Sequence, residues 1–369
     1  MKRTTKRLLA LALALAMVLS LAACGGSGGN SGSGSGGGSD SGSGAPAQSD
    51  GAAPSAEGVF SDGSNRFLTV AAPPASSALY SFWVGLGDTL SGVYSNIKPT
   101  VSESQGAVAI AKSVRLGDAD IGNSVSATDY ENYHGLGVFD GEPNPDLRML
   151  FYYEVTWEMF CVDGSTGITD ITQLDGQRFN PGGTGTSAEA ICKNMLGIFG
   201  TEPKYFDASQ ADASDAYSNR EIVGTVKLGP AVDSYVMQLD AAIPISMISL
   251  TEDQVAKITA EYPYLISGTI PANTYNSVDY DVTVVGTPQG CQMLKDTFTQ
   301  EEQYQMVKAV IEDGASVWQS AYPTGAGNDL CALTLQSSVP LAAGTVQYLV
   351  EKGYDVPAEI IPEEYVPVG

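Results

Sequence analysis

The alternation of strand-like and helix-like patterns in the first part of the folded region is the feature that most restricts the fold of this chain. A short apolar run at 67–72 precedes a loop, and aromatic and aliphatic residues then recur at helical spacing over 78–90. A strand pattern at 97–101, a helix pattern at 106–116 and a brief strand at 120–122 follow. This order favours a parallel sheet with helices on its faces, and therefore an α/β fold.

The later segments add neighbouring strands and capped helices. Two strand candidates, 147–153 and 157–162, follow each other directly, and a further one lies at 281–285. Capping boxes at 251–254 and 299–302 predict that a helix begins at each of these places. The last third of the chain is therefore expected to be mostly helical.

The first residues predict export and lipidation. Four basic residues precede an apolar run at 8–21, which is too short to span a bilayer as a mature helix. The run ends in LAACG, which resembles the lipobox of bacterial lipoproteins. We expect a signal peptide over 1–23, a lipid on the thiol of Cys24, and anchoring to the outer face of the cell membrane. An ordinary signal peptide with a chance cysteine is the alternative.

A segment dominated by glycine and serine separates this start from the folded region. Residues 24–58 lack the apolar side chains needed for a core, so we expect a flexible tether. About thirty such residues hold a domain roughly 30 Å from the membrane. The remaining chain, from about residue 66 to 369, is long enough for two domains of ordinary size.

The charge of the chain excludes some classes of partner. The formal net charge is −24, and it is −28 without the four basic residues of the signal segment. Such a surface repels nucleic acid and anionic lipid, but it does not exclude a small anionic ligand, which responds to local dipoles. We therefore expect no nucleic-acid partner.

Four cysteines lie beyond Cys24, and their spacing does not decide their state. They contain no C-x-x-C pair and no accompanying histidine cluster, so we expect no structural zinc and no cofactor. Two disulfides and four buried free thiols both remain open. The residues concerned are Cys161, Cys192, Cys291 and Cys331.

A glycine-rich loop leads into a helix in the middle of the chain. The segment 179–195 reads FNPGGTGTSAEAICKNM, and its T-x-x-E capping box predicts that the helix begins at Thr186 or Ser187. Free N–H groups and a partial positive charge at such a helix start can hold an anion. The lysine of a Walker A loop and the third glycine of a dinucleotide loop are missing, which leaves a carboxylate site or a capped helix without a ligand.

Several segments together resemble a known receptor family. They are APPASSALY at 72–80, SESQGAV at 102–108, DADIG at 118–122, VSA at 125–127, and the stretch 169–186 that enters the glycine-rich loop. In their order and spacing these segments resemble the TAXI family, the solute receptors of tripartite ATP-independent periplasmic (TRAP) transporters. The fourth segment, 125–127, departs from the family pattern, because valine and alanine flank its serine where polar residues are usual.

The resemblance implies a two-lobed α/β fold of the type II periplasmic-binding-protein kind, with a hinge and a ligand cleft. The first lobe would comprise 66–158 and 278–369, and the second lobe 159–277. The implied function is that of an extracytoplasmic receptor and not of an enzyme. It would capture a small carboxylate or amino acid, glutamate-like or dicarboxylate-like, and deliver it to a membrane permease with fused small and large subunits. We expect a monomer.

The resemblance also implies the ligand-binding residues. Hydroxyls and backbone N–H groups of both lobes would hold carboxylate oxygens, and a tyrosine would shape the pocket. The residues implied are Ser76, Ser77, Tyr80, Gln105, Gly106, Ser126, Gly183, Thr184, Gly185 and Thr186.

Three other functions remain as alternatives. A substrate-binding lipoprotein of an ABC transporter would have the same fold and role. An extracytoplasmic enzyme is disfavoured, because the one histidine, His134, has no evident nucleophile partner, and Ser95–Lys98 matches S-x-x-K without its accompanying motifs. A surface sensor that reports ligand occupancy is the third.

Overall fold

The computed structural model describes residues 65–75 and 77–368, which fall within one compact unit of the chain. The predicted signal peptide (1–23), the lipidated Cys24, the tether (24–58) and the predicted ligand contact Ser76 lie outside the described residues. Within the described ranges, no helix is both long enough and apolar enough to cross a membrane.

The described strands form one mixed sheet in the order β2-β1-β3-β10-β4-β7-β5-β6, with β8 paired to β4 and β9 paired to β10. Strands β1, β2 and β3 pair in parallel, as do β5, β6 and β7, whereas β4 and β10 pair antiparallel with their neighbours. The strands are β1 (Arg66–Ala72), β2 (Ile97–Glu103), β3 (Ile121–Val125), β4 (Leu147–Asp163), β5 (Arg178–Asn180), β6 (Lys204–Tyr205), β7 (Gly224–Gly229), β8 (Ile245–Met247), β9 (Ile266–Ile270) and β10 (Val282–Leu294).

Helices cover the sheet, and three of them begin at a threonine that was predicted to cap them. Thr186, Thr251 and Thr299 each accept a hydrogen bond from the backbone N–H three residues later. The helices are α2 (Tyr80–Val93), α3 (Ala107–Leu116), α4 (Ser126–His134), α5 (Ser187–Ile198), α6 (Gln210–Ser218), α7 (Ser234–Ala242), α8 (Glu252–Glu261), α9 (Gln300–Lys308), α10 (Ala315–Ala321), α11 (Leu330–Thr334) and α12 (Ala343–Glu351).

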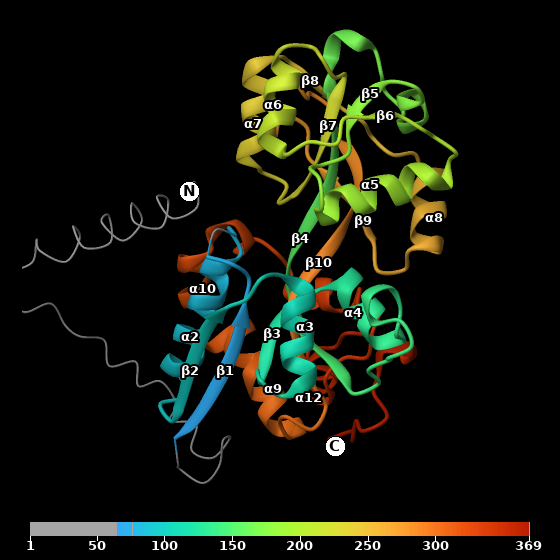
Figure 1. The fold of residues 1–369 in the computed structure, drawn as a ribbon. Coiled ribbons are helices and arrows are strands. Elements are labelled where there is room, and N and C mark those ends of the chain that lie inside the picture. The colour runs from blue at the N-terminus through green and yellow to red at the C-terminus, as the bar shows by residue number, and fades with distance from the viewer. Residues whose placement is uncertain (1–64, 76, 369) are drawn as a thin grey trace, which may run out of the picture. The chain divides into compact units, whose positions relative to one another are not determined.

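The longest strands, β4 and β10, lie side by side and run through both halves of the described fold (Figure 1). Their antiparallel register pairs Thr287 with Thr156 and Leu294 with Leu147, and it shifts at Gln289/Gly290 and at Cys291/Gln292. Each shift marks a β-bulge or irregularity, which bends the ladder locally. The two strands therefore connect the halves as one continuous ribbon.

The buried apolar side chains divide into clusters at the two ends of this ribbon. Residues 149–153 of β4 belong to a cluster with α2 and with α9 to α12, which we call the first lobe. Residues 159–162 of β4 belong to two clusters with α5 to α8, which we call the second lobe. On β10, Val282–Val285 belong to the second-lobe clusters. We propose that β10 crosses between the lobes at Gly286–Gly290, beyond the boundary that the sequence analysis placed at 277.

The α/β alternation predicted from the sequence is confirmed, and one strand prediction is wrong. The patterns at 147–153 and 157–162 were expected to be two strands, whereas β4 continues through both. Glu154 lies between them and is buried, and its carboxylate oxygens accept hydrogen bonds from Tyr322 Oη (2.9 Å) and Asn328 Nδ2 (3.3 Å). Because these partners compensate for its burial, the strand passes through a charged residue without a break.

All four cysteines beyond Cys24 are free and buried in the described structure. This decides between the two states that the sequence left open. Burial raises the pKa of the Cys161 and Cys291 thiols well above their usual value. These thiols are therefore packing groups with little thiolate character.

The β4–β10 ribbon depends on glycine at Gly290. A Cβ atom there would overlap the carbonyl oxygen of Phe151 and the ring of Tyr152 on the partner strand. We expect Gly290→Ala to lower the free energy of unfolding by about 1–3 kcal/mol, which is the usual cost of overpacking. Gly92→Ala is the control, because this exposed glycine in α2 has open space around it, and we expect it to gain about 0.5–1 kcal/mol. Chemical denaturation of both variants tests this, and equal stabilities would contradict it.

Candidate functional site

A cavity of about 410 Å³ lies where the two lobes meet the β4–β10 crossing. Its lining comes from the first lobe, the second lobe and the crossing strands. The lining residues are Pro73, Leu79, Ala107, Val108, Asn123, Val125, Ala127, Thr128, Glu131, Thr156, Ser187, Ala190, Ile191, Asn194, Leu228, Tyr264, Thr287 and Gln289.

The crossing strands contribute a cluster of buried polar side chains to this cavity. Thr156 Oγ1 lies 2.8 Å from Thr287 Oγ1, and Gln289 Nε2 donates to Thr156 Oγ1 at 3.0 Å. Thr287 and Gln289 are two residues apart on β10, so the pleat turns both side chains to the same face. All three residues are less than a tenth exposed. They offer hydroxyl and amide groups to a ligand without any net charge.

Asn123, the middle residue of β3, presents an amide of fixed orientation. Its Oδ1 accepts hydrogen bonds from Trp83 Nε1 and from Tyr153 Oη, both at 3.0 Å. Because both partners are donors, the oxygen must face them, and the Nδ2 group is left to donate elsewhere. Among the described residues no partner takes that donor, and Asn123 lines the cavity. The side chain is therefore a hydrogen-bond donor held ready for an acceptor on a ligand.

In the first predicted loop, residues 72–80, the residues that line the cavity are neighbours of the predicted ligand contacts. Pro73 and Leu79 line it, whereas Ser77 and Tyr80 do not. Ser77 Oγ accepts from the Leu79 N–H at 3.3 Å, and Tyr80 begins α2 and packs against the first-lobe core. The roles of Ser77 and Tyr80 as ligand contacts stay predictions.

At α3, too, the residues that line the cavity follow the predicted ones in the sequence. Gln105 is exposed and Gly106 is the residue before the helix, with a φ of 132°. Ala107 and Val108, the first residues of α3, line the cavity in their place. That Gln105 and Gly106 contact a ligand stays a prediction.

Ser126 forms a bond between the lobes. It begins α4 in the first lobe, is 1% exposed, and donates from Oγ to the backbone oxygen of Tyr264 at 2.8 Å. Tyr264 packs against the second-lobe core, and its ring centroid lies 5.7 Å from that of Tyr130 on α4. In this arrangement the hydroxyl is therefore used to join the lobes, and its role in ligand binding stays a prediction.

The glycine-rich loop before α5 is held largely by groups of the chain itself. The Gly185 N–H donates to Glu189 Oε2 at 2.5 Å, and the Thr184 N–H donates to the Ala208 oxygen at 3.1 Å. Thr186 Oγ1 donates to the oxygen of Gly183 at 2.8 Å. One backbone N–H of this loop, that of Gly185, is thus engaged by a carboxylate from α5.

None of the four predicted loop residues lines the cavity. The lining instead comes from Ser187, Ala190, Ile191 and Asn194 of α5, the helix that the loop introduces. Gly183, Thr184, Gly185 and Thr186 thus position α5, and ligand contact by any of them stays a prediction.

The sequence analysis missed the polar residues at the crossing. Thr156, Thr287 and Gln289 lie on two strands that are more than 120 residues apart in the chain. No local pattern brings them together, and only the strand pairing does. Asn123 directly follows the DADIG segment, so the end of that predicted strand was a signal that could have indicated it.

A buried carboxyl group lies beside the cavity without lining it. Glu158 of β4 is 1% exposed, and neither of its carboxyl oxygens has a hydrogen-bond partner among the described residues. Its cross-strand partner Leu228 does line the cavity. Burial raises the pKa of Glu158 well above its usual value, because the charged form loses its hydration.

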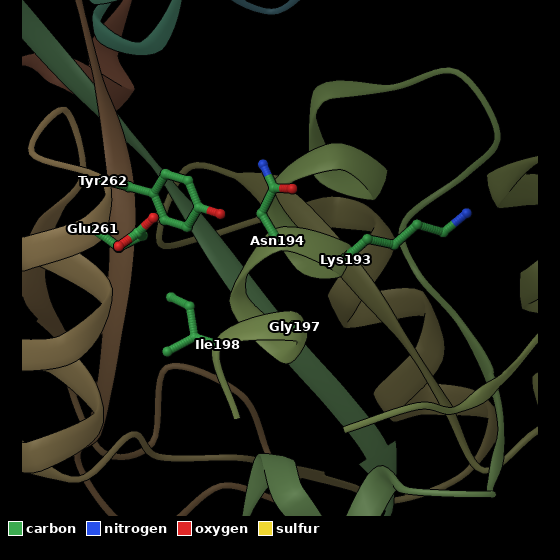
Figure 2. Close-up of a pocket in the computed structure, with 6 residues that line it drawn as sticks. All are labelled: Lys193, Asn194, Gly197, Ile198, Glu261 and Tyr262. Atoms are coloured by element: carbon green, nitrogen blue, oxygen red, sulfur yellow. The ribbon is translucent and has the colours of Figure 1, made fainter. Parts of the chain in front are cut away.

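A second depression lies on the second lobe alone, between α5 and the end of α8 (Figure 2). Its residues are Lys193, Asn194, Gly197, Ile198, Glu261 and Tyr262, and its volume is about 490 Å³. In Figure 2 the Lys193 side chain points away from the others, and its Nζ pairs with Glu189 Oε1 at 2.6 Å. The second lobe alone lines this depression, so the cavity whose lining comes from both lobes is the better candidate. Among the described residues, no cluster of His, Cys, Asp or Glu could hold a metal ion.

Removal of the Ser126 hydroxyl should loosen the lobes. We expect Ser126→Ala to remove about 0.5–1.5 kcal/mol of stabilisation between α4 and Tyr264, which is the net value of one hydrogen bond. Small-angle X-ray scattering of the ligand-free protein should then show a larger mean radius of gyration. Ser81→Ala is the control, because Ser81 Oγ bonds only within the first lobe, to Ala78. An unchanged scattering profile for Ser126→Ala would contradict this.

The buried Glu158 should make stability fall as pH rises. A carboxyl whose pKa is raised by folding contributes its full stabilisation at a pH below its pKa in the unfolded chain. This stabilisation is lost as the pH rises from that value through the higher pKa in the folded protein. We therefore expect Glu158→Gln to gain stability relative to the wild type between about pH 5 and about pH 8. Urea denaturation at both values measures this, with the exposed Glu359→Gln as control. A constant difference between Glu158→Gln and the wild type would contradict it.

Comparison with solved structures supports the fold. A TctC solute binding protein from Polaromonas aligns at 14% identity with a TM-score of 0.51, over 78% of this chain and 98% of that one. The aliphatic sulphonate binding protein SsuA from Escherichia coli aligns at 12% identity with a TM-score of 0.42, over 82% and 98%. A TRAP periplasmic solute binding protein from Rhodobacter sphaeroides aligns at 12% identity with a TM-score of 0.42, over 76% and 84%. The chain thus has the two-lobed α/β fold of periplasmic solute-binding proteins.

Sequence comparison places the chain in a family. No curated protein matches it. A family model described as NMT1-like matches residues 70–353, which is well over half of the chain. This protein therefore belongs to the NMT1-like family.

Proposed function

We propose that this protein is an extracytoplasmic solute-binding receptor of a TRAP-type secondary transporter, of the TAXI kind. It captures a small carboxylate or amino acid by closure of its lobes and delivers it to the membrane permease. We further propose that it acts as a monomer, anchored by a lipid on Cys24 to the outer face of the cell membrane.

The observation that carries this proposal is the cavity whose lining comes from both lobes and from the two strands between them. A ligand in such a cavity contacts both lobes only when they approach each other. It therefore binds the closed form more tightly than the open form and shifts the population toward closure. A receptor needs this coupling, because the permease must distinguish a loaded from an empty protein.

The hydrogen-bonding groups suit a carboxylate that must later be released. Asn123 Nδ2 donates, the hydroxyls of Thr156 and Thr287 can donate, and α5 begins at Ser187 with its positive dipole end beside the cavity. Neutral donors hold a carboxylate without a buried ion pair. The bound solute is therefore not trapped by a large desolvation penalty on release.

The likeness to the Polaromonas solute binding protein supports the receptor role, and the TRAP assignment rests on the sequence resemblance. An ABC-transporter lipoprotein receptor is the alternative with the same fold. A neighbouring gene for a permease with fused small and large subunits, without an ATPase gene, would favour the TRAP assignment. An adjacent ATPase gene would favour the alternative.

A catalytic role finds no support around His134. This residue is exposed at the end of α4, and its ring packs against Tyr130 and Tyr133 at centroid distances of 4.4 and 5.0 Å. No serine or cysteine lies in hydrogen-bond contact with it among the described residues. Its surroundings are those of an aromatic surface residue.

Ligand binding should raise the thermal stability of the mature protein. A screen of carboxylates and amino acids against the protein in mild detergent should find compounds that raise its melting temperature. At a hundred times the dissociation constant the stabilisation is about 2.7 kcal/mol. No shift with any compound would contradict the proposed function.

Thr287→Val should weaken binding of any such compound without unfolding the protein. The change replaces a cavity hydroxyl by a methyl group of similar size. We expect about a tenfold loss of affinity in isothermal titration calorimetry, which corresponds to about 1.4 kcal/mol. Thr89→Val is the matched control, because this buried threonine of α2 bonds to Gly314 and is no part of the cavity. Equal affinities for both variants would contradict the role of Thr287.

A further inference from the structure

We propose that the cavity selects ligands that carry a positively charged amine, with Glu131 as the counter-ion. This inference rests on the proposed receptor function and narrows its substrate class. An amino acid would then be favoured over a dicarboxylate.

The first observation is the charge of the lining. Glu131 is the one charged side chain among the described residues of the cavity, and no lysine or arginine lines it. A dicarboxylate would bring two negative charges beside a third one without any opposing cation. Like charges repel more strongly in a partly desolvated cavity than in water, so a dianion is strongly disfavoured.

Two basic side chains on the lining elements are engaged with carboxylates outside the cavity. Lys193 of α5 pairs with Glu189 Oε1 at 2.6 Å and with Asp207 Oδ1 at 3.2 Å. Lys227 of β7 lies 3.8 Å from Asp233 Oδ2. If either lysine turned toward the cavity, it would have to leave these partners.

The second observation is the state of Glu131 itself. It lies near the end of α4, and its side chain forms no hydrogen bond or ion pair among the described residues. Its removal from water raises the pKa of this carboxyl. Tyr264 of the second lobe also lines the cavity, and its ring is within electrostatic range of Glu131. A partly desolvated carboxylate without a partner is stabilised when an ammonium group binds beside it.

The third observation is the second carboxyl group beside the cavity. Glu158 is also without a partner, and its cross-strand neighbour Leu228 belongs to the lining. Burial raises its pKa and so favours the neutral form of the carboxyl, which carries no positive charge in either state. The cavity and its surroundings therefore offer carboxyl oxygens that can accept hydrogen bonds from an amine.

The rest of the lining fits the remainder of such a ligand. Asn123 Nδ2 and the threonine hydroxyls can hold a carboxylate or carbonyl group. Leu79, Val108 and Ile191 supply apolar surface for a short side chain. A zwitterionic amino acid with an apolar or weakly polar side chain matches all three kinds of surface.

A panel of matched compounds tests this proposal in the mature protein. It comprises the standard amino acids, their desamino monocarboxylates, their decarboxylated amines and linear dicarboxylates, each measured by isothermal titration calorimetry. We expect amine-bearing compounds to bind at least about tenfold more tightly than the desamino compounds of the same carbon skeleton. Dicarboxylates should bind weakest.

Glu131→Gln identifies the residue responsible. We expect it to weaken the amine-bearing compounds by at least about tenfold and to leave the desamino compounds unchanged or slightly tighter. Asp140→Asn is the control, because it removes the same charge from the first lobe outside the cavity. Circular dichroism shows that both variants are folded.

The outcomes separate this inference from the receptor function. Desamino acids or dicarboxylates that bind as tightly as the amines would overturn the amine preference and leave the receptor role standing. Unchanged amine affinity in Glu131→Gln would overturn the role of Glu131. If no compound of the panel binds, the receptor function and this inference both fall.

Discussion

The antiparallel pairing of β4 with β10 is the interaction on which the rest of this structure depends. These strands are the ones that contribute side chains to the cores of both lobes, and the remaining described strands add to their edges. The pairing is tight, because glycines at Gly286 and Gly290 let the backbones approach where a Cβ atom would overlap the partner strand. Relative movement of the lobes must therefore bend or twist this ribbon, which limits the motion to a hinge.

The same ribbon explains why polar side chains line part of a cavity that lies between two apolar cores. On β4 the fully buried members of the clusters end at Tyr153 and resume at Met159, and between them Trp157 packs against the second-lobe core. Polar groups can be accommodated there only if they satisfy one another, as Thr156, Thr287 and Gln289 do. A ligand that replaces part of this network must offer hydrogen bonds of its own. The network therefore selects ligands that carry hydrogen-bonding groups.

Helix starts, which depend on neighbouring residues, could be predicted from the sequence. The polar residues of the crossing, which depend on strand pairing, could not. Helix starts at Thr186, Thr251 and Thr299 follow from contacts within four residues, so their capping boxes could be recognised without the fold. The anion site at the glycine-rich loop was predicted from the same kind of local pattern. The Gly185 N–H of this loop donates to the carboxylate of Glu189, and spacing alone could not show that a side chain of α5 itself would reach the loop. To predict the residues of the crossing, one would have to know the register between two strands that are distant in the sequence.

The lobes are joined by a weak bond as well as by a strong ribbon, and the balance matters for the proposed receptor function. The hydrogen bond from Ser126 to Tyr264 holds α4 against the second lobe. A net value of about 1 kcal/mol changes a population ratio by about fivefold. Such a bond favours the closed form enough to raise the apparent affinity of a ligand, because less of the binding energy is used to bring the lobes together. It is also small enough that a bound solute can still dominate the equilibrium, so that closure continues to report the presence of cargo.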